Sequence, residues 1–67
     1  MAVAPTKDEG VYIECVLHGG LMKVTALDPS TGIEASVFGP AGARETLKRN
    51  AVAKLVWVLK KKEANSE

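Results

Sequence analysis

The stretch that decides the fold runs from residue 11 to residue 27 and reads VYIECVLHGGLMKVTAL. Apolar and polar side chains alternate on both sides of its two glycines, which is typical of strands with one buried face. Gly19 and Gly20 suit the positive φ angles of a two-residue primed turn. A shift of the pairing by one residue would scatter the apolar set over both faces, so the pattern fixes the register of the hairpin. The predicted pairs are Leu17 with Met22, Cys15 with Val24, and Ile13 with Ala26.

A second turn follows in the sequence Asp-Pro-Ser-Thr-Gly of residues 28–32. Pro29 sets φ for the first loop position, and Asp28 and Thr31 can bond nearby backbone amides. Gly32 accepts the left-handed conformation that ends such a loop. The next run, residues 33–38, places alternate apolar residues on the same face as the hairpin does. The sequence therefore predicts an antiparallel meander with the second strand in the middle.

The C-terminal third is predicted to form a helix. Gly39-Pro40 ends the sheet, and from about residue 41 to 62 the apolar spacing changes from two to about 3.6. The alternative is a fourth strand over residues 52–59, which are rich in β-branched side chains. The helix-forming run of residues 44–49 and the lack of a turn signal after Asn50 favour the helix. The expected buried stripe holds Leu47, Ala51, Leu55 and Val58, widened by Val52, Val56 and Leu59.

The predicted fold class is thus α+β, a three-stranded antiparallel β-meander followed by one C-terminal α-helix packed on one sheet face. Residues 1–9 show no periodicity and are expected to form a disordered arm, residues 10–62 a single β-β-β-α domain, and residues 63–67 a frayed tail. A chain of 67 residues is near the lower limit for folding on its own core. One helix covers only one side of a sheet, so the other side is expected to stay exposed.

Composition excludes several classes of function. Cys15 is the only cysteine and His18 the only histidine, so we expect no internal disulfide, no metal site and no cofactor. No nucleophile, base and orienting group can be assembled, and an enzyme is not expected. No apolar run approaches the ~20 residues of a membrane span. These absences and the lone cysteine favour a bacterial cytoplasmic protein.

The exposed sheet face is the first candidate for function. Tyr12, Val16 and Phe38 are predicted to lie there among polar residues. If they form one continuous apolar patch, they mark a surface for a protein partner or for a homodimer. The other interpretation is that they are separate exposed apolar residues, which are normal on a protein surface. The leading hypothesis is a small non-enzymatic interaction module that self-associates through this face.

The basic C-terminal helix is the second candidate. The net charge is only +1, but all Lys and Arg except Lys7 and Lys23 lie in the C-terminal third. Trp57 falls off the predicted buried stripe, near Lys54, Lys60 and Lys61, and could stack on a nucleic-acid base. The alternatives are a solvated helix face and an indole that packs over the margin of the sheet. Weak nucleic-acid binding is therefore the alternative function.

The runs at residues 11–14 and 23–34 resemble an uncharacterised family of short alphaproteobacterial proteins. Similar stretches follow at residues 39–41, 53–55 and 58–59, so the resemblance covers about residues 11–62. Its most visible motif is the Asp-Pro-x-Thr-Gly turn of residues 28–32. The resemblance implies a bacterial cytosolic protein, and it implies no activity because the family is one of unknown function.

Overall fold

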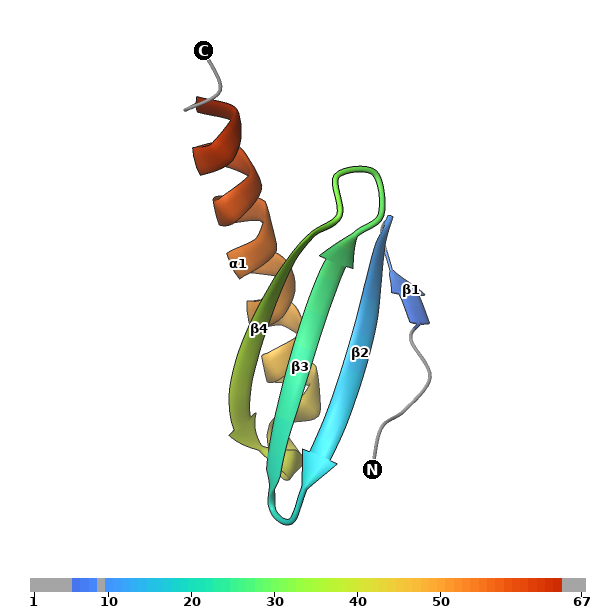
Figure 1. Cartoon of the computed structure of the whole chain (residues 1–67). Coiled ribbons are helices and arrows are strands. Elements are labelled where there is room, and N and C mark those ends of the chain that lie inside the picture. The colour runs from blue at the N-terminus through green and yellow to red at the C-terminus, as the bar shows by residue number, and fades with distance from the viewer. Residues whose placement is uncertain (1–5, 9, 65–67) are drawn as a thin grey trace.

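Three long antiparallel strands and one C-terminal helix build the domain, as the sequence predicts (Figure 1). The structure is a computed structural model that describes residues 6–8 and 10–64, with side chains from residue 10 to 62. The strands are β2 (Val11–His18), β3 (Leu21–Asp28) and β4 (Ile33–Pro40). A short 3-10 turn, η1 (Ala41–Ala43), leads into the helix α1 (Arg44–Ala64). The expected α+β class and the β-β-β-α order are confirmed.

The hairpin of β2 and β3 has the predicted register. Its pairs include Leu17 with Met22, Cys15 with Val24, and Ile13 with Ala26. Gly19 has a φ of 60°, which is the left-handed conformation that the turn requires of its first residue. The inner apolar face of the hairpin is therefore set by the chain's alternation and by this turn.

The loop between β3 and β4 is held by the side chain of Asp28. Its carboxylate accepts hydrogen bonds from the Thr31 hydroxyl at 3.0 Å and from the Ser30 hydroxyl at 3.0 Å. The bond from Thr31, followed by those from Ser30, lowers the pKa of Asp28 because each stabilises the charged carboxylate. Gly32 closes the loop with a φ of 77°, and its N–H bonds to the Asp28 carbonyl at 2.8 Å.

A fourth, short strand corrects the expectation for the N-terminal segment. β1 (Thr6–Asp8) pairs antiparallel with the outer edge of β2, so part of the region predicted as a disordered arm is a strand. These residues carry no apolar alternation, and their strand conformation comes from the free edge that β2 offers. Residues 1–5 and 9 lie outside the described residues. At the other end, the predicted frayed tail begins too early, because α1 continues to Ala64 and residues 65–67 lie outside the description.

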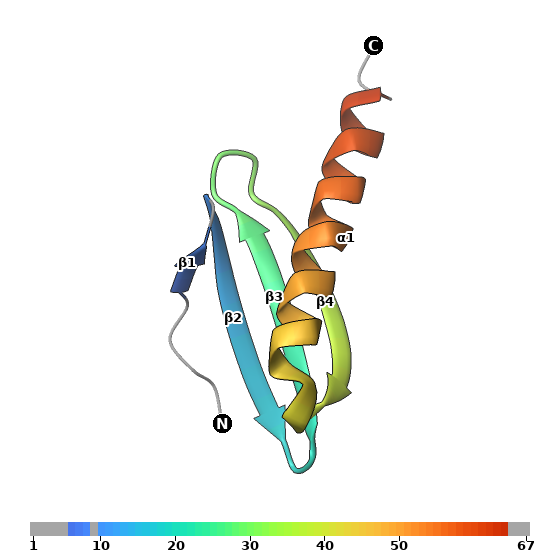
Figure 2. The ribbon, with the colours of Figure 1, turned by 180° about the vertical axis from the view of Figure 1, so that it is seen from behind.

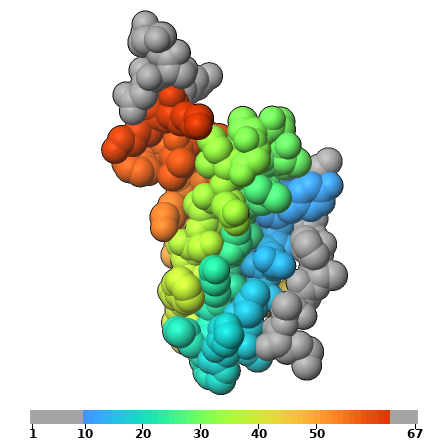
Figure 3. Space-filling view, viewed as in Figure 1, coloured from blue at the N-terminus to red at the C-terminus, as the bar shows by residue number. Residues whose placement is uncertain are grey.

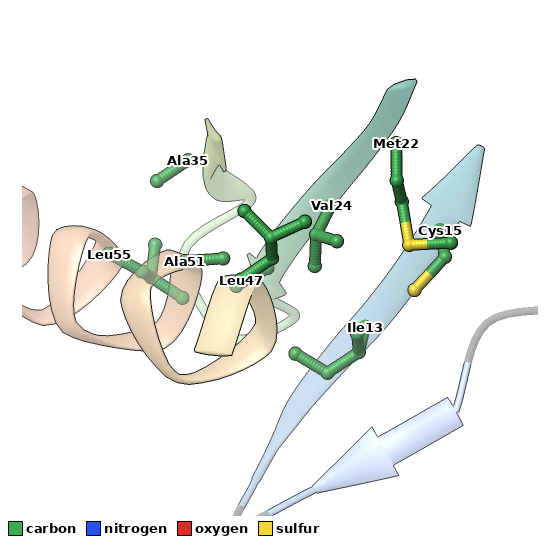
Figure 4. Close-up of a cluster of buried hydrophobic side chains, with 9 residues drawn as sticks. Ile13, Cys15, Met22, Val24, Ala35, Leu47, Ala51 and Leu55 are labelled. Atoms are coloured by element: carbon green, nitrogen blue, oxygen red, sulfur yellow. The ribbon is translucent and has the colours of Figure 1, made fainter. Parts of the chain in front are cut away.

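The helix lies across the inner face of the sheet, over β3 and β4 (Figure 2). Leu47, Ala51 and Leu55 are buried and face Val24 and Ile13 of the sheet (Figure 4). The helical state of residues 52–59 settles the choice between helix and strand. The complete buried cluster comprises Ile13, Cys15, Met22, Val24, Ala26, Ala35, Leu47, Ala51 and Leu55.

The buried stripe predicted for α1 wrongly includes Val56. Val52 and Leu59 are half-buried and pack against the core, but Val56 is 44% exposed. Val56 lies about 100° around the helix from Leu55, on the flank away from Leu47 and Ala51. The helix is also longer than the strands, because 21 residues span about 31 Å and eight strand residues about 27 Å. The C-terminal end of α1 extends beyond the sheet (Figure 2).

Candidate protein-interaction surface

Figure 3 shows the outer face of the sheet, which carries no helix. The strand register arranges its side chains in rows across the strands. Because strand side chains alternate between faces, every second register pair contributes to this side. The rows run from the end near the β3–β4 loop to the end near the Gly19-Gly20 turn. They are Tyr12–Leu27–Glu34, Glu14–Thr25–Ser36, Val16–Lys23–Phe38 and His18–Leu21–Pro40.

The second row is polar and divides the face. The Thr25 and Ser36 hydroxyl oxygens lie 2.8 Å apart in a hydrogen bond, and Thr25 is only 8% exposed. Tyr12 lies on one side of this row, and Val16 and Phe38 lie on the other. Tyr12 and Val16 are four positions apart in β2, which is about 13 Å along a strand. Of the three residues predicted for this face, Val16 and Phe38 lie in one row with Lys23 between them, and Tyr12 lies two rows away.

The apolar part of the face lies at its hairpin end. Phe38 is 61% exposed and Leu21 47% exposed, while Val16 is half-buried. Lys23 stands between Val16 and Phe38, with its ammonium 6.0 Å from the centre of the Phe38 ring, within the range of a cation–π contact. We call these four residues, Val16, Leu21, Lys23 and Phe38, the sheet-face patch.

Leu21 belongs to the patch although it is not among the three residues predicted for this face. The signal was present, since the Gly19-Gly20 turn pairs Leu21 with His18 and so fixes its side of the sheet. The register therefore predicts that Leu21 lies in the row next to Val16 and Phe38. Tyr12, which alternation predicts for this face, lies in the row farthest from Leu21.

The second candidate surface lies on the side of α1 that faces away from the sheet. Trp57 is 61% exposed, so its indole does not pack over the sheet margin, and the Lys61 ammonium lies 5.0 Å from the centre of its ring. Lys60 is exposed on the next flank of the helix. Lys54 is directed elsewhere, since its ammonium donates a 2.9 Å hydrogen bond to the Ser36 carbonyl of β4. Three of the four residues predicted for nucleic acid thus lie on one open side.

Other kinds of site find little support. Within residues 6–8 and 10–64, no three His, Cys, Asp or Glu side chains gather as metal ligands would. Cys15 is a buried free thiol and packs as part of the core. The described part of the chain has no helix with the length and apolar character that crossing a membrane requires.

Fold and surface together define a small α+β domain, an antiparallel meander with a helix on one face and a partly apolar patch on the other. The chain belongs to the family described as a domain of unknown function, DUF6898, whose model matches residues 8–62. This agrees with the resemblance to an uncharacterised family. Neither a curated protein nor a solved structure matches the chain.

Proposed function

We propose that the protein is a small, non-enzymatic interaction module that associates with a second copy of itself through the sheet-face patch. The observation that supports it most directly is Phe38, which is 61% exposed in the same row as Val16 and next to Leu21. Apolar side chains that gather on the uncovered side of a two-layer domain are a common basis of association. The lone buried cysteine and the family resemblance support a bacterial, and more narrowly alphaproteobacterial, cytoplasmic protein.

The size of the face fits a weak homodimer. Three strands of eight residues and one of three, spaced at about 4.8 Å with about 3.4 Å per residue, give a face of about 440 Å². Two such faces in contact bury about 900 Å², which is just below the ~1,000 Å² expected of a stable biological interface and fits weak, transient association. We therefore expect association that depends on concentration, and no permanent dimer.

The charges of the face favour a second copy over a strongly charged partner. Lys23 is the cation of the patch, Glu14 lies in the neighbouring row, and Glu34 lies in the row beyond it. When two faces pack with a shift of one row, Lys23 of one copy comes beside Glu14 of the other. A two-fold axis forms that contact twice, so each copy supplies the complement of the other.

The test compares Phe38→Asp with the matched variant Trp57→Asp. Both aromatic residues are 61% exposed, and they lie on opposite sides of the domain. Burial of a phenylalanine contributes about 1.5–3 kcal/mol, and a two-fold interface uses it twice, so Phe38→Asp should weaken the dimer at least about 100-fold. Sedimentation velocity from about 10 µM to 1 mM measures the dimer fraction.

Wild type and Trp57→Asp are expected to dimerise alike as concentration rises, and Phe38→Asp is expected to stay monomeric. A wild type that is strictly monomeric up to the highest concentration contradicts the proposal. Equal effects of the two substitutions contradict it as well, since they would show that any exposed aromatic side chain causes the association.

The basic helix supports one alternative, weak binding of single-stranded nucleic acid through Trp57, Lys60 and Lys61. The exposed indole beside an ammonium favours it, because bases stack on aromatic rings and lysines contact phosphates. Titration of the single tryptophan's fluorescence with oligonucleotides at low salt tests this function. Quenching that weakens with added salt supports it, and constant fluorescence at every oligonucleotide length rejects it.

A further inference from the structure

The β4 edge of the sheet is open among the described strands, which follow the order β1-β2-β3-β4. The Ala41 N–H bonds to the Gly20 carbonyl at 2.9 Å and so continues the ladder with β3. Backbone groups of an antiparallel strand alternate between its two sides. Odd residues of β4 therefore bond to β3, and the N–H and C=O groups of Glu34, Ser36 and Phe38 point outward. Such a row is a template for another strand.

The middle of this row is occupied. The Lys54 ammonium reaches from α1 around the edge and donates to the Ser36 carbonyl at 2.9 Å. Lys54 lies about 100° around the helix from the buried Leu55, on the side of α1 that overhangs β4. The contact uses one of the outward-pointing carbonyl acceptors, and it places a positive charge at the β4 edge.

We propose that Lys54 guards the β4 edge and prevents a second copy of the chain from extending the sheet there. The excluded partner is β4 of the other copy in antiparallel pairing about Ser36. That arrangement would form about six backbone hydrogen bonds, two between the serines and four between Glu34 and Phe38 of opposite copies. It requires the Ser36 carbonyl that Lys54 occupies, and it would bring both Lys54 ammoniums close to the two-fold axis. This inference does not depend on the sheet-face patch.

The registers centred on Glu34 and on Phe38 are unfavourable for other reasons. Pairing about Glu34 places two carboxylates directly opposite each other, which is destabilising. Pairing about Phe38 sets Pro40 against Ser36, and proline has no N–H to donate. Registers centred on Ala35 or Val37 pair Ser36 with Glu34 or Phe38 of the other copy, so they also need the Ser36 carbonyl. Lys54 therefore occupies an acceptor that the remaining antiparallel registers of β4 require.

The test neutralises Lys54 in a background that cannot associate through the sheet face. Leu21→Asp removes an exposed apolar side chain of the patch without changing β4. In this background we compare Lys54→Met and Lys54→Gln with Lys54→Arg, which keeps the charge and a donor. Lys60→Met is the matched control, because Lys60 is an exposed lysine of the same helix about 120° away from Lys54. Sedimentation gives the dimer constant, and amide hydrogen exchange by NMR reports on the edge.

The two neutral variants are expected to dimerise at least about ten-fold more tightly than the background. Their amides at Glu34, Ser36 and Phe38 should become protected as concentration rises, while Lys54→Arg and Lys60→Met behave as the background. Neutral variants that keep the native circular dichroism and remain monomeric overturn the proposal. Association without protection of these three amides also overturns it. A failure of the Phe38→Asp experiment leaves this result unaffected, because the two experiments examine different surfaces.

Discussion

The substitution Gly39→Ala tests how closely the helix approaches the sheet. A Cβ atom at Gly39 would lie 2.5 Å from Leu47 Cδ2 and 3.3 Å from Leu47 Cδ1 and Cγ. Gly39 does not have a positive φ, so the constraint is space and not backbone conformation. Leu47 is 5% exposed and its methyl groups are enclosed by the core, so the helix or the side chain must shift.

The expected loss of stability follows from two opposing terms. Extra volume in a packed core costs about 1–3 kcal/mol. Replacing glycine with alanine returns about 0.4–1 kcal/mol by restricting the unfolded chain. The net destabilisation is therefore about 1–2 kcal/mol, which corresponds to a fall in Tm of about 4–16 °C for a domain of this size.

Urea unfolding of a double-mutant cycle with Leu47→Ala identifies the cause. Leu47→Ala alone costs about 2–5 kcal/mol, but it also vacates the space that the new methyl group needs. The double variant should thus be more stable than the sum of the single effects predicts, by about 1–2 kcal/mol. Gly42→Ala is the control, because nothing lies within 4 Å of a Cβ there. An additive cycle, or a Gly39→Ala variant as stable as Gly42→Ala, would refute the reasoning.

Two further predictions concern the loop and the core. The pKa of Asp28 is lowered in the folded state, so its contribution to stability is present above the unfolded pKa of about 3.9 and is lost as pH falls through the lower folded value. Asp28→Asn should therefore lose less stability than wild type between about pH 5 and 2, and parallel urea midpoints would contradict this. Leu55 is fully buried, and Leu55→Ala should cost about 2–5 kcal/mol, comparable with the whole net stability of so small a domain. Circular dichroism should show a largely unfolded chain at 25 °C, whereas Val56→Ala should unfold like wild type.

The parts of the fold that the sequence predicts are those set by local rules. Gly19-Gly20 and the alternation around it determine the β2–β3 register, and the Asp28 loop forms through side chains within four residues of one another. β1 could not be predicted in this way, because its three residues are polar and aperiodic and become a strand only against β2. The exposure of Val56 depends on how far the sheet extends beneath the helix, which a helical wheel does not contain.

The two candidate surfaces also differ in whether local rules or tertiary structure determine them. The rows of the outer face follow from register alone, so Leu21 could have replaced Tyr12 in the predicted patch. The bond from Lys54 to Ser36 joins residues 18 positions apart and depends on which strand the helix overhangs. Spacing on the helix assigned Lys54 to a basic surface with Trp57, whereas tertiary structure assigns it to the edge of the sheet.

The protection of the β4 edge by Lys54 limits the size of the assembly, and the reason lies in symmetry. A two-fold contact through the sheet-face patch closes a dimer and uses up the patch of both copies. A second two-fold contact, through β4, would use a different surface and leave the sheet-face patch available. Each copy could then bind two neighbours, and the assembly would grow beyond a dimer unless its geometry formed a closed ring. With both surfaces open, so small a domain would be at risk of forming extended aggregates. The positive charge of Lys54 at Ser36 and the missing donor at Pro40 therefore limit association to the face, where the contact area of about 900 Å² keeps it weak and reversible.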